Sequence, residues 1–99
     1  MIQRVVVIKL KQAYANSDDR RAVAKHTRSV LQPIPGVLHL DVATPADAHC
    51  ERSWDLCLLL RFEDLDAVES YRADQRHRAY VDIFLGPILE VIRVWNFEI

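Results

Sequence analysis

Four residues in the last third of the chain have side chains and spacings that suit acid–base chemistry on a bound molecule. Tyr71 and His77 are followed at helical intervals by Tyr80 and Phe84, so His77, Tyr80 and Phe84 share one face of a helix. Because an imidazole titrates near neutral pH, His77 can act as a general base at physiological pH. The alternative is that His77 lies half exposed near the start of its helix and has no chemical role.

Arg4 is the second candidate, because it has the same strand parity as the apolar Val6 and Ile8. Its guanidinium is therefore expected on their side of the sheet, where a cation needs an anion. If Arg4 reaches His77, its charge favours the neutral imidazole, and if it reaches a ligand, it binds a carboxylate or phosphate. Alternatively, Arg4 pairs with a helix carboxylate or extends off the end of its strand.

His26 lies between Val23 and Val30 in the predicted first helix. This spacing places it on the inner stripe of that helix, where it either lines the same cavity or is a packing residue with satisfied hydrogen bonds. Tyr80 and Phe84 likewise suit either a ligand contact or the core.

The remaining metal-ligating side chains do not predict a metal or cofactor site. His39 and Asp41 share a strand face, but a metal needs at least one further ligand. Cys50 and Cys57 match no Cys-x-x-Cys pattern and are interpreted as free thiols. The sequence has no phosphate-binding glycine loop, so we predict no metal and no cofactor.

Length and composition indicate one folded domain over residues 1–99. The chain has 51% hydrophobic residues, with only 2 Gly and 4 Pro, which leaves little room for disordered segments. Lys and Arg total 13 against 14 for Asp and Glu, with the signs interspersed, so nucleic acid is not an expected partner. The apolar run Val5–Ile8 is too short for a signal peptide or membrane span, and we expect a cytoplasmic protein.

The order of predicted elements gives the fold class. Runs of β-branched and apolar residues predict strands, whereas capping residues followed by apolar stripes predict helices. The predicted strands are 2–11, 37–43, 54–62 and 91–97; the predicted helices are 18–31, 65–72 and 75–85, the last ending at Gly86-Pro87; and a polar connection spans 44–53. This order is typical of an α+β, ferredoxin-like βαββαβ unit, with a four-stranded antiparallel sheet and helices on one face.

Both faces of that sheet are apolar in the middle. The third strand places one set of residues on one face (Trp54, Leu56, Leu58, Leu60, Phe62) and a second set on the other (Asp55, Cys57, Leu59, Arg61). Since the face without helices is normally polar, the surplus apolar surface predicts a partner surface. A second copy of the chain, packed sheet to sheet as a homodimer, is the expected partner.

Several segments in this order resemble the stress-responsive A/B barrel domain family. They are the opening Met1–Lys11, Ile34–Val37, Trp54–Leu58 and Phe62–Tyr71, with His77 six residues after Tyr71. The resemblance covers nearly the whole chain and implies a dimeric α+β barrel built from two ferredoxin-like units.

The resemblance also implies roles for two residues. One plant member of the family closes a linear polyketide by aldol chemistry in a cavity between sheet and helices, using a histidine base and a nearby tyrosine. The matching positions here are His77 and Tyr71. This chain has Arg4 where members commonly have a histidine, and Asp74-Gln75 where they have a His-Pro pair.

Three hypotheses of function remain open. The first is a homodimeric barrel that binds a small apolar or anionic molecule between sheet and helices, with catalytic His77 and Tyr71 and ligand contacts from Arg4, Val6, Ile8, His26, Tyr80 and Phe84. The second is a non-enzymatic stress-response or scaffolding dimer without a ligand pocket. The third is a small monooxygenase-like or polyketide-cyclase-like enzyme.

Overall fold

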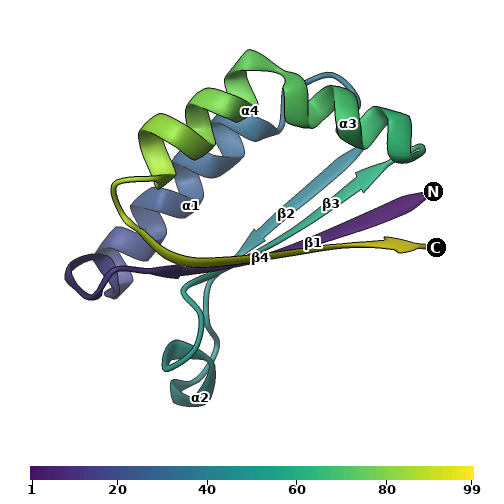
Figure 1. Ribbon diagram of the computed structural model, residues 1–99. Coiled ribbons are helices and arrows are strands. Elements are labelled where there is room, and N and C mark those ends of the chain that lie inside the picture. The colour runs from purple at the N-terminus through teal and green to yellow at the C-terminus, as the bar shows by residue number, and fades with distance from the viewer.

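Four antiparallel strands form a single sheet in the computed structural model, which describes residues 1–99 (Figure 1). The strand order is β2-β3-β1-β4, with β1 (Ile2–Leu10) and β3 (Leu56–Phe62) in the middle. The edge strands are β2 (His39–Ala43) and β4 (Leu89–Glu98). All neighbouring strands pair antiparallel. The predicted ferredoxin-like α+β arrangement is therefore confirmed.

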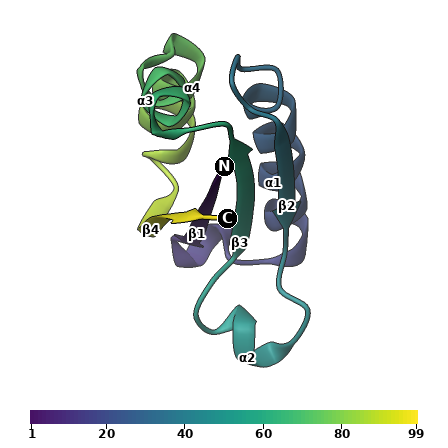
Figure 2. The same cartoon turned by 90° about the vertical axis from the view of Figure 1, so that its right-hand side faces the viewer.

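The helices α1 (Ser17–Leu31), α3 (Leu65–Ala73) and α4 (Gln75–Ala79) cover one face of this sheet (Figure 2). Each begins where a side chain accepts a hydrogen bond from a free backbone N–H in the first turn. The capping residues are Asn16, Asp64 and Asp74, respectively.

The predicted regular helix 75–85 is wrong in its second half. After α4, residues Tyr80–Leu85 form a wider π-helix, η2, in which the Gly86 N–H donates to the carbonyl oxygen of Val81. A β-carbon at Gly86 would lie 2.8 Å from the carbonyl oxygen of Asp82, so the close approach that ends this segment requires glycine. The break predicted at Gly86-Pro87 is present, because η2 ends at Leu85.

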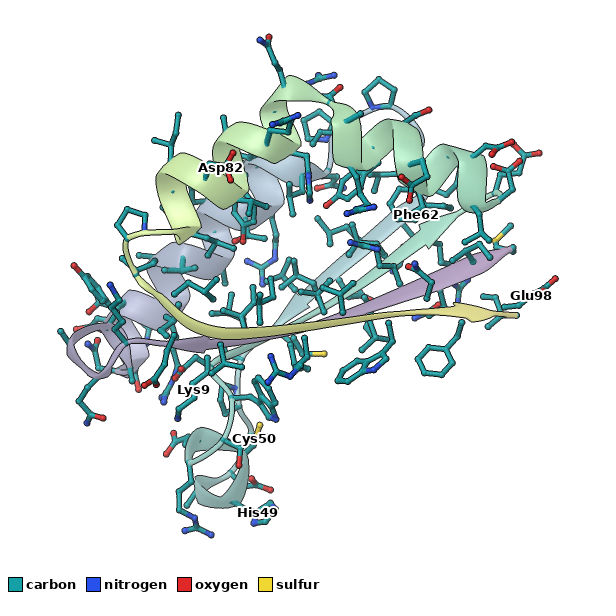
Figure 3. All side chains as sticks on the ribbon, viewed as in Figure 1. Lys9, His49, Cys50, Phe62, Asp82 and Glu98 are labelled. Carbon is teal, nitrogen blue, oxygen red and sulfur yellow. The ribbon has the colours of Figure 1, made fainter.

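The connection 44–53 contains a short helix that the sequence interpretation missed. Asp47 accepts a hydrogen bond from the Cys50 N–H at 2.8 Å and caps α2 (Ala48–Glu51). This helix projects from the opposite side of the sheet to the other helices, where Figure 3 labels His49 and Cys50. A one-turn 3-10 helix, η1 (Gln12–Tyr14), also follows β1.

Two strands begin two residues later than predicted. β2 starts at His39 rather than residue 37, because Gly36 has a φ of 95° and the Val37 N–H donates to the Ile34 carbonyl in a turn. β3 starts at Leu56 rather than Trp54, because Asp55 turns inward.

Asp55 is 1% exposed and binds partners on two elements. Its carboxylate accepts from the Leu10 N–H at 2.7 Å and from Nε of Arg20 on α1 at 2.8 Å. The parity prediction that placed Asp55 on the outer face with Cys57 is therefore wrong. Trp54 lies at a hollow with the outer-face residues Val7 and Cys57.

The core lies between the sheet and the helices. Along β1 every second residue is buried, beginning with Ile2, and along β3 the buried residues are Leu56, Leu58, Leu60 and Phe62. Figure 3 shows Phe62 beneath α3 on the helix-covered side.

The opposite face, which α1, α3 and α4 leave uncovered, also presents apolar side chains. Val5 and Val7 on β1 and Leu59 on β3 are half-buried there. On β4, Trp95 is 48% exposed and Phe97 is 54% exposed. We call this surface the free face. No helix has the length and apolar character needed to cross a membrane.

Candidate functional site

A cavity of about 180 Å³ lies between the sheet and the helices. Most of its walls are apolar, and no acidic side chain lines it. The sheet contributes Arg4, Val6, Ile8, Leu58, Ile92 and Val94, and the helical segments contribute Leu31, Tyr71, Arg72, His77, Tyr80, Val81 and Leu85.

The structure brings six of the predicted site residues to this cavity: Arg4, Val6, Ile8, Tyr71, His77 and Tyr80. It does not bring His26 and Phe84 there; instead their rings contact each other with centroids 4.0 Å apart. His26 is exposed, so its predicted place on the inner stripe of the first helix is wrong. The buried stripe of α1 runs through Arg20, Val23, Ala24, Thr27 and Leu31, and position 26 falls to one side of it.

His77, near the start of α4, is oriented by the end of α3. Its Nδ1 lies 3.2 Å from the backbone carbonyl oxygen of Arg72. A carbonyl oxygen can only accept, so Nδ1 carries the proton and Nε2 of the neutral ring is free to receive one. Burial lowers the pKa of His77, and the charges of Arg4 and Arg72 lower it further against the opposing hydrogen bond. The imidazole is therefore a neutral base at pH 7.

The ring of Tyr71 lies next to this imidazole. The side chain is 2% exposed, and its ring lies 4.5 Å from that of His77 and 5.0 Å from that of Phe62. The hydroxyl has no hydrogen-bond partner in the protein, whereas every fully buried side-chain nitrogen or oxygen atom has one. The hydroxyl is consequently accessible from the cavity that Tyr71 lines. Burial raises the pKa of Tyr71, which keeps the hydroxyl protonated and able to donate.

Arg4 is a buried cation without an acidic partner. It is 7% exposed, and its Nη1 donates to Oδ1 of Asn96 at 3.1 Å. No Asp or Glu forms an ion pair with it; the neighbouring acid, Glu69, binds Arg72 instead at 3.1 Å. Burial lowers the pKa of Arg4, but a guanidinium remains charged at neutral pH. The alternative of a helix carboxylate partner is therefore not observed.

Tyr80 forms a fixed part of the cavity wall. Its hydroxyl lies 2.7 Å from Oγ1 of Thr27, and Thr27 donates its single proton to the Val23 carbonyl at 2.7 Å. Tyr80 is therefore the donor to Thr27. Burial raises the pKa of Tyr80 to about 12. This hydrogen bond joins η2 to α1 and fixes the position of Tyr80 in the cavity wall.

Sequence reasoning missed Asn96 and Arg72. Asn96 faces Arg4 because the two residues are paired across β1 and β4, and this register cannot be read from either strand alone. Arg72 reaches the cavity from the last turn of α3 and is otherwise an ordinary exposed residue.

The remaining candidates form no second site. His39 and Asp41 lie 2.9 Å apart on the surface, and Cys50 and Cys57 are free thiols. No group of three or more His, Cys, Asp or Glu side chains is arranged to hold a metal ion.

Comparisons with known proteins agree with this architecture. The sequence model of the stress responsive A/B barrel domain matches residues 2–99. A comparison with curated protein sequences gave no match.

Three solved structures illustrate the similarity. A Mesorhizobium loti protein, described as a dabb family protein with a ferredoxin-like fold, superposes with a TM-score of 0.84 and 21% identity, covering 99% of this chain and 95% of that one. A dimeric ferredoxin-like protein from Bacteroides fragilis gives 0.80 and 19%, covering 99% and 95%. Another dimeric protein of this kind, from Thermobifida fusca, gives 0.79 and 16%, covering 99% and 90%. At these identities the likeness shows the fold.

Proposed function

The chain belongs to the stress responsive A/B barrel domain family, and from that premise we propose that it binds a small, largely apolar molecule between sheet and helices, with His77 as a general base. One observation carries the proposal: a neutral imidazole with a free Nε2 lines an apolar cavity next to Tyr71, whose hydroxyl has no partner in the protein. Closure of the cavity by Phe84, Trp54 and Tyr80 would argue against binding; of these three only Tyr80 lines the cavity, and a volume of about 180 Å³ remains.

The chemistry that this arrangement suits is proton abstraction next to a carbonyl group. His77 Nε2 takes the proton. In this step the C–H pair forms the C=C double bond of an enolate while the π pair of the carbonyl group moves onto its oxygen, and the Tyr71 hydroxyl donates a hydrogen bond to that oxygen as its charge develops. The imidazolium that forms keeps its Nδ1–H bond to the Arg72 carbonyl, which favours the charged ring.

We also propose that the protein is a homodimer that packs free face against free face. Val5, Val7, Leu59, Trp95 and Phe97 supply the apolar surface that a second copy would cover. The B. fragilis and T. fusca proteins with this fold are described as dimeric. In this arrangement the ligand cavity lies on the other side of the sheet and stays open.

Binding can be tested with cyclohexanone as a neutral ring probe, followed by amide chemical shifts. Val94→Phe, on the edge strand β4, is expected to fill the cavity and abolish binding. Ile83→Phe is the matched control, because Ile83 is 75% exposed on η2 and does not line the cavity. Equal binding by the two variants would place the probe elsewhere and contradict the proposal.

The base is tested separately by the exchange of deuterium into the α-carbon of cyclohexanone. General-base catalysis contributes roughly 10²–10⁴-fold, so His77→Gln should lose at least about a hundredfold in exchange rate while the probe still binds. Exchange that is unchanged in His77→Gln would remove the catalytic role and leave the binding role.

A further inference from the structure

We infer that the ligand of this cavity is a one-ring carboxylate, with its carboxylate on the guanidinium of Arg4 and its ring against the apolar walls. This inference rests on the proposed binding function and adds the chemical class of the ligand.

Arg4 carries a charge that no acidic side chain compensates. A buried ion without a paired counter-ion is strongly destabilising, yet Arg4 is 7% exposed and its one protein partner is the neutral amide of Asn96. No acidic side chain lines the cavity. The site therefore lacks one negative charge, which a monoanionic ligand would supply.

The free donors of Arg4 lie along one edge of its guanidinium. Asn96 occupies Nη1 of Arg4, which leaves Nε and Nη2, the two nitrogens along one edge of the guanidinium. That edge matches the two oxygens of a planar carboxylate in a bidentate pair. Because every fully buried side-chain nitrogen or oxygen atom has a hydrogen-bond partner, these two unpartnered nitrogens are accessible. The Tyr71 hydroxyl is accessible for the same reason and can donate to the same anion.

The cavity has room for about one ring. Its volume is about 180 Å³, and an apolar cavity of about 150 Å³ holds one benzene molecule. The space therefore suits one ring with a small substituent and is too small for a nucleotide or a long acyl chain. The other walls include Ile8, Leu31 and Leu85, which favour an apolar ring.

The inference is tested by comparing benzoate with benzamide, its neutral isostere, by isothermal titration and amide chemical shifts. A hydrogen-bonded contact to a charged group favours the anion by about 10–100-fold, so benzoate should bind at least about tenfold more tightly. Asn96→Asp would place a carboxylate beside Arg4 within the chain. Since Asn96 is exposed on an edge strand, this variant should fold, lose the benzoate preference and keep its benzamide affinity.

Gln12→Glu is the matched control, because it adds one negative charge at an exposed position that does not line the cavity; it should keep the preference. Equal binding of benzoate and benzamide to the unmodified protein would overturn this inference and leave the proposed binding function. A full benzoate preference in Asn96→Asp would also overturn it, because Arg4 would then not hold the anion. If benzoate, benzamide and cyclohexanone all fail to bind, both proposals fall.

Discussion

Replacing Asp55 with Asn should destabilise the domain by about 3 kcal/mol, because it removes one charge from a buried ion pair. The carboxylate is 1% exposed and accepts from Arg20 Nε at 2.8 Å and from the Leu10 N–H at 2.7 Å. An asparagine can keep the bond from Leu10, but its NH₂ group or its neutral oxygen then faces an uncompensated guanidinium. Breaking a buried pair in this way typically costs about 3–5 kcal/mol.

The lower end of that range applies because Arg20 has a second acidic neighbour. Its Nη1 lies 3.5 Å from Oε1 of Glu51, whose side chain is 48% exposed. This long contact with a solvated carboxylate offsets only part of the lost charge. For a domain of this size, about 3 kcal/mol corresponds to a fall in Tm of roughly 12–24 °C.

The assay is thermal and urea unfolding at one fixed protein concentration, because the proposed dimer would make Tm depend on concentration. Asp64→Asn is the matched control: Asp64 is an exposed helix cap bonded to the Ala67 N–H at 2.9 Å, and Asn caps a helix as well as Asp does. If Asp55→Asn loses less than about 1 kcal/mol, or no more than the control, the pair is effectively solvated and the reasoning from burial is refuted.

Three further predictions concern the free face, the cavity wall and the base. Trp95→Asp, which puts a charge on the free face, should convert the proposed dimer to a monomer in analytical ultracentrifugation; a dimer that is unchanged in this variant would place the interface elsewhere. Tyr80→Phe should cost about 1 kcal/mol in urea unfolding, because Thr27 loses a buried donor, and no loss would mean that water replaces it. Burial and nearby cations keep the pKa of His77 below its usual value, so its protonation below about pH 6.5 adds a positive charge near Arg4. Benzoate should therefore bind more tightly as the pH falls, by about fivefold (roughly 1 kcal/mol). His77→Gln should bind benzoate with the same affinity over that pH range.

Much of the architecture could be predicted from alternation and capping within single segments. The parity of Arg4 with Val6 and Ile8 placed its guanidinium on the helix-covered face, and the structure has it there. The order of strands and helices gave the ferredoxin-like class. These features depend on neighbours in the chain, so the sequence displays them directly.

The features that sequence reasoning missed depend on contacts between distant segments. Asn96 reaches Arg4 only through the register of β1 against β4, and Asp55 turns inward to meet Arg20 on another element. His26 points outward because of the way α1 is rotated about its own axis. The few apolar residues of α1 are not enough to predict that rotation from the sequence. A π-helix at Tyr80–Leu85 has no distinctive residue pattern, so a regular helix was the natural expectation.

The position of Arg4 also joins the two proposals through one electrostatic coupling. Burial lowers the pKa of His77 and the charge of Arg4 lowers it further, so the imidazole is neutral and a weak base. A carboxylate on Arg4 would neutralise that charge and raise the pKa of His77 toward its usual value. By thermodynamic linkage, the rise in the pKa of His77 on benzoate binding and the gain in benzoate affinity on protonation of His77 correspond to the same coupling free energy. A histidine at position 4 would lose its charge in the pH range in which His77 titrates, whereas the guanidinium of Arg4 keeps its charge throughout that range. The binding of an anion to Arg4, and not pH alone, would therefore set the base strength of His77.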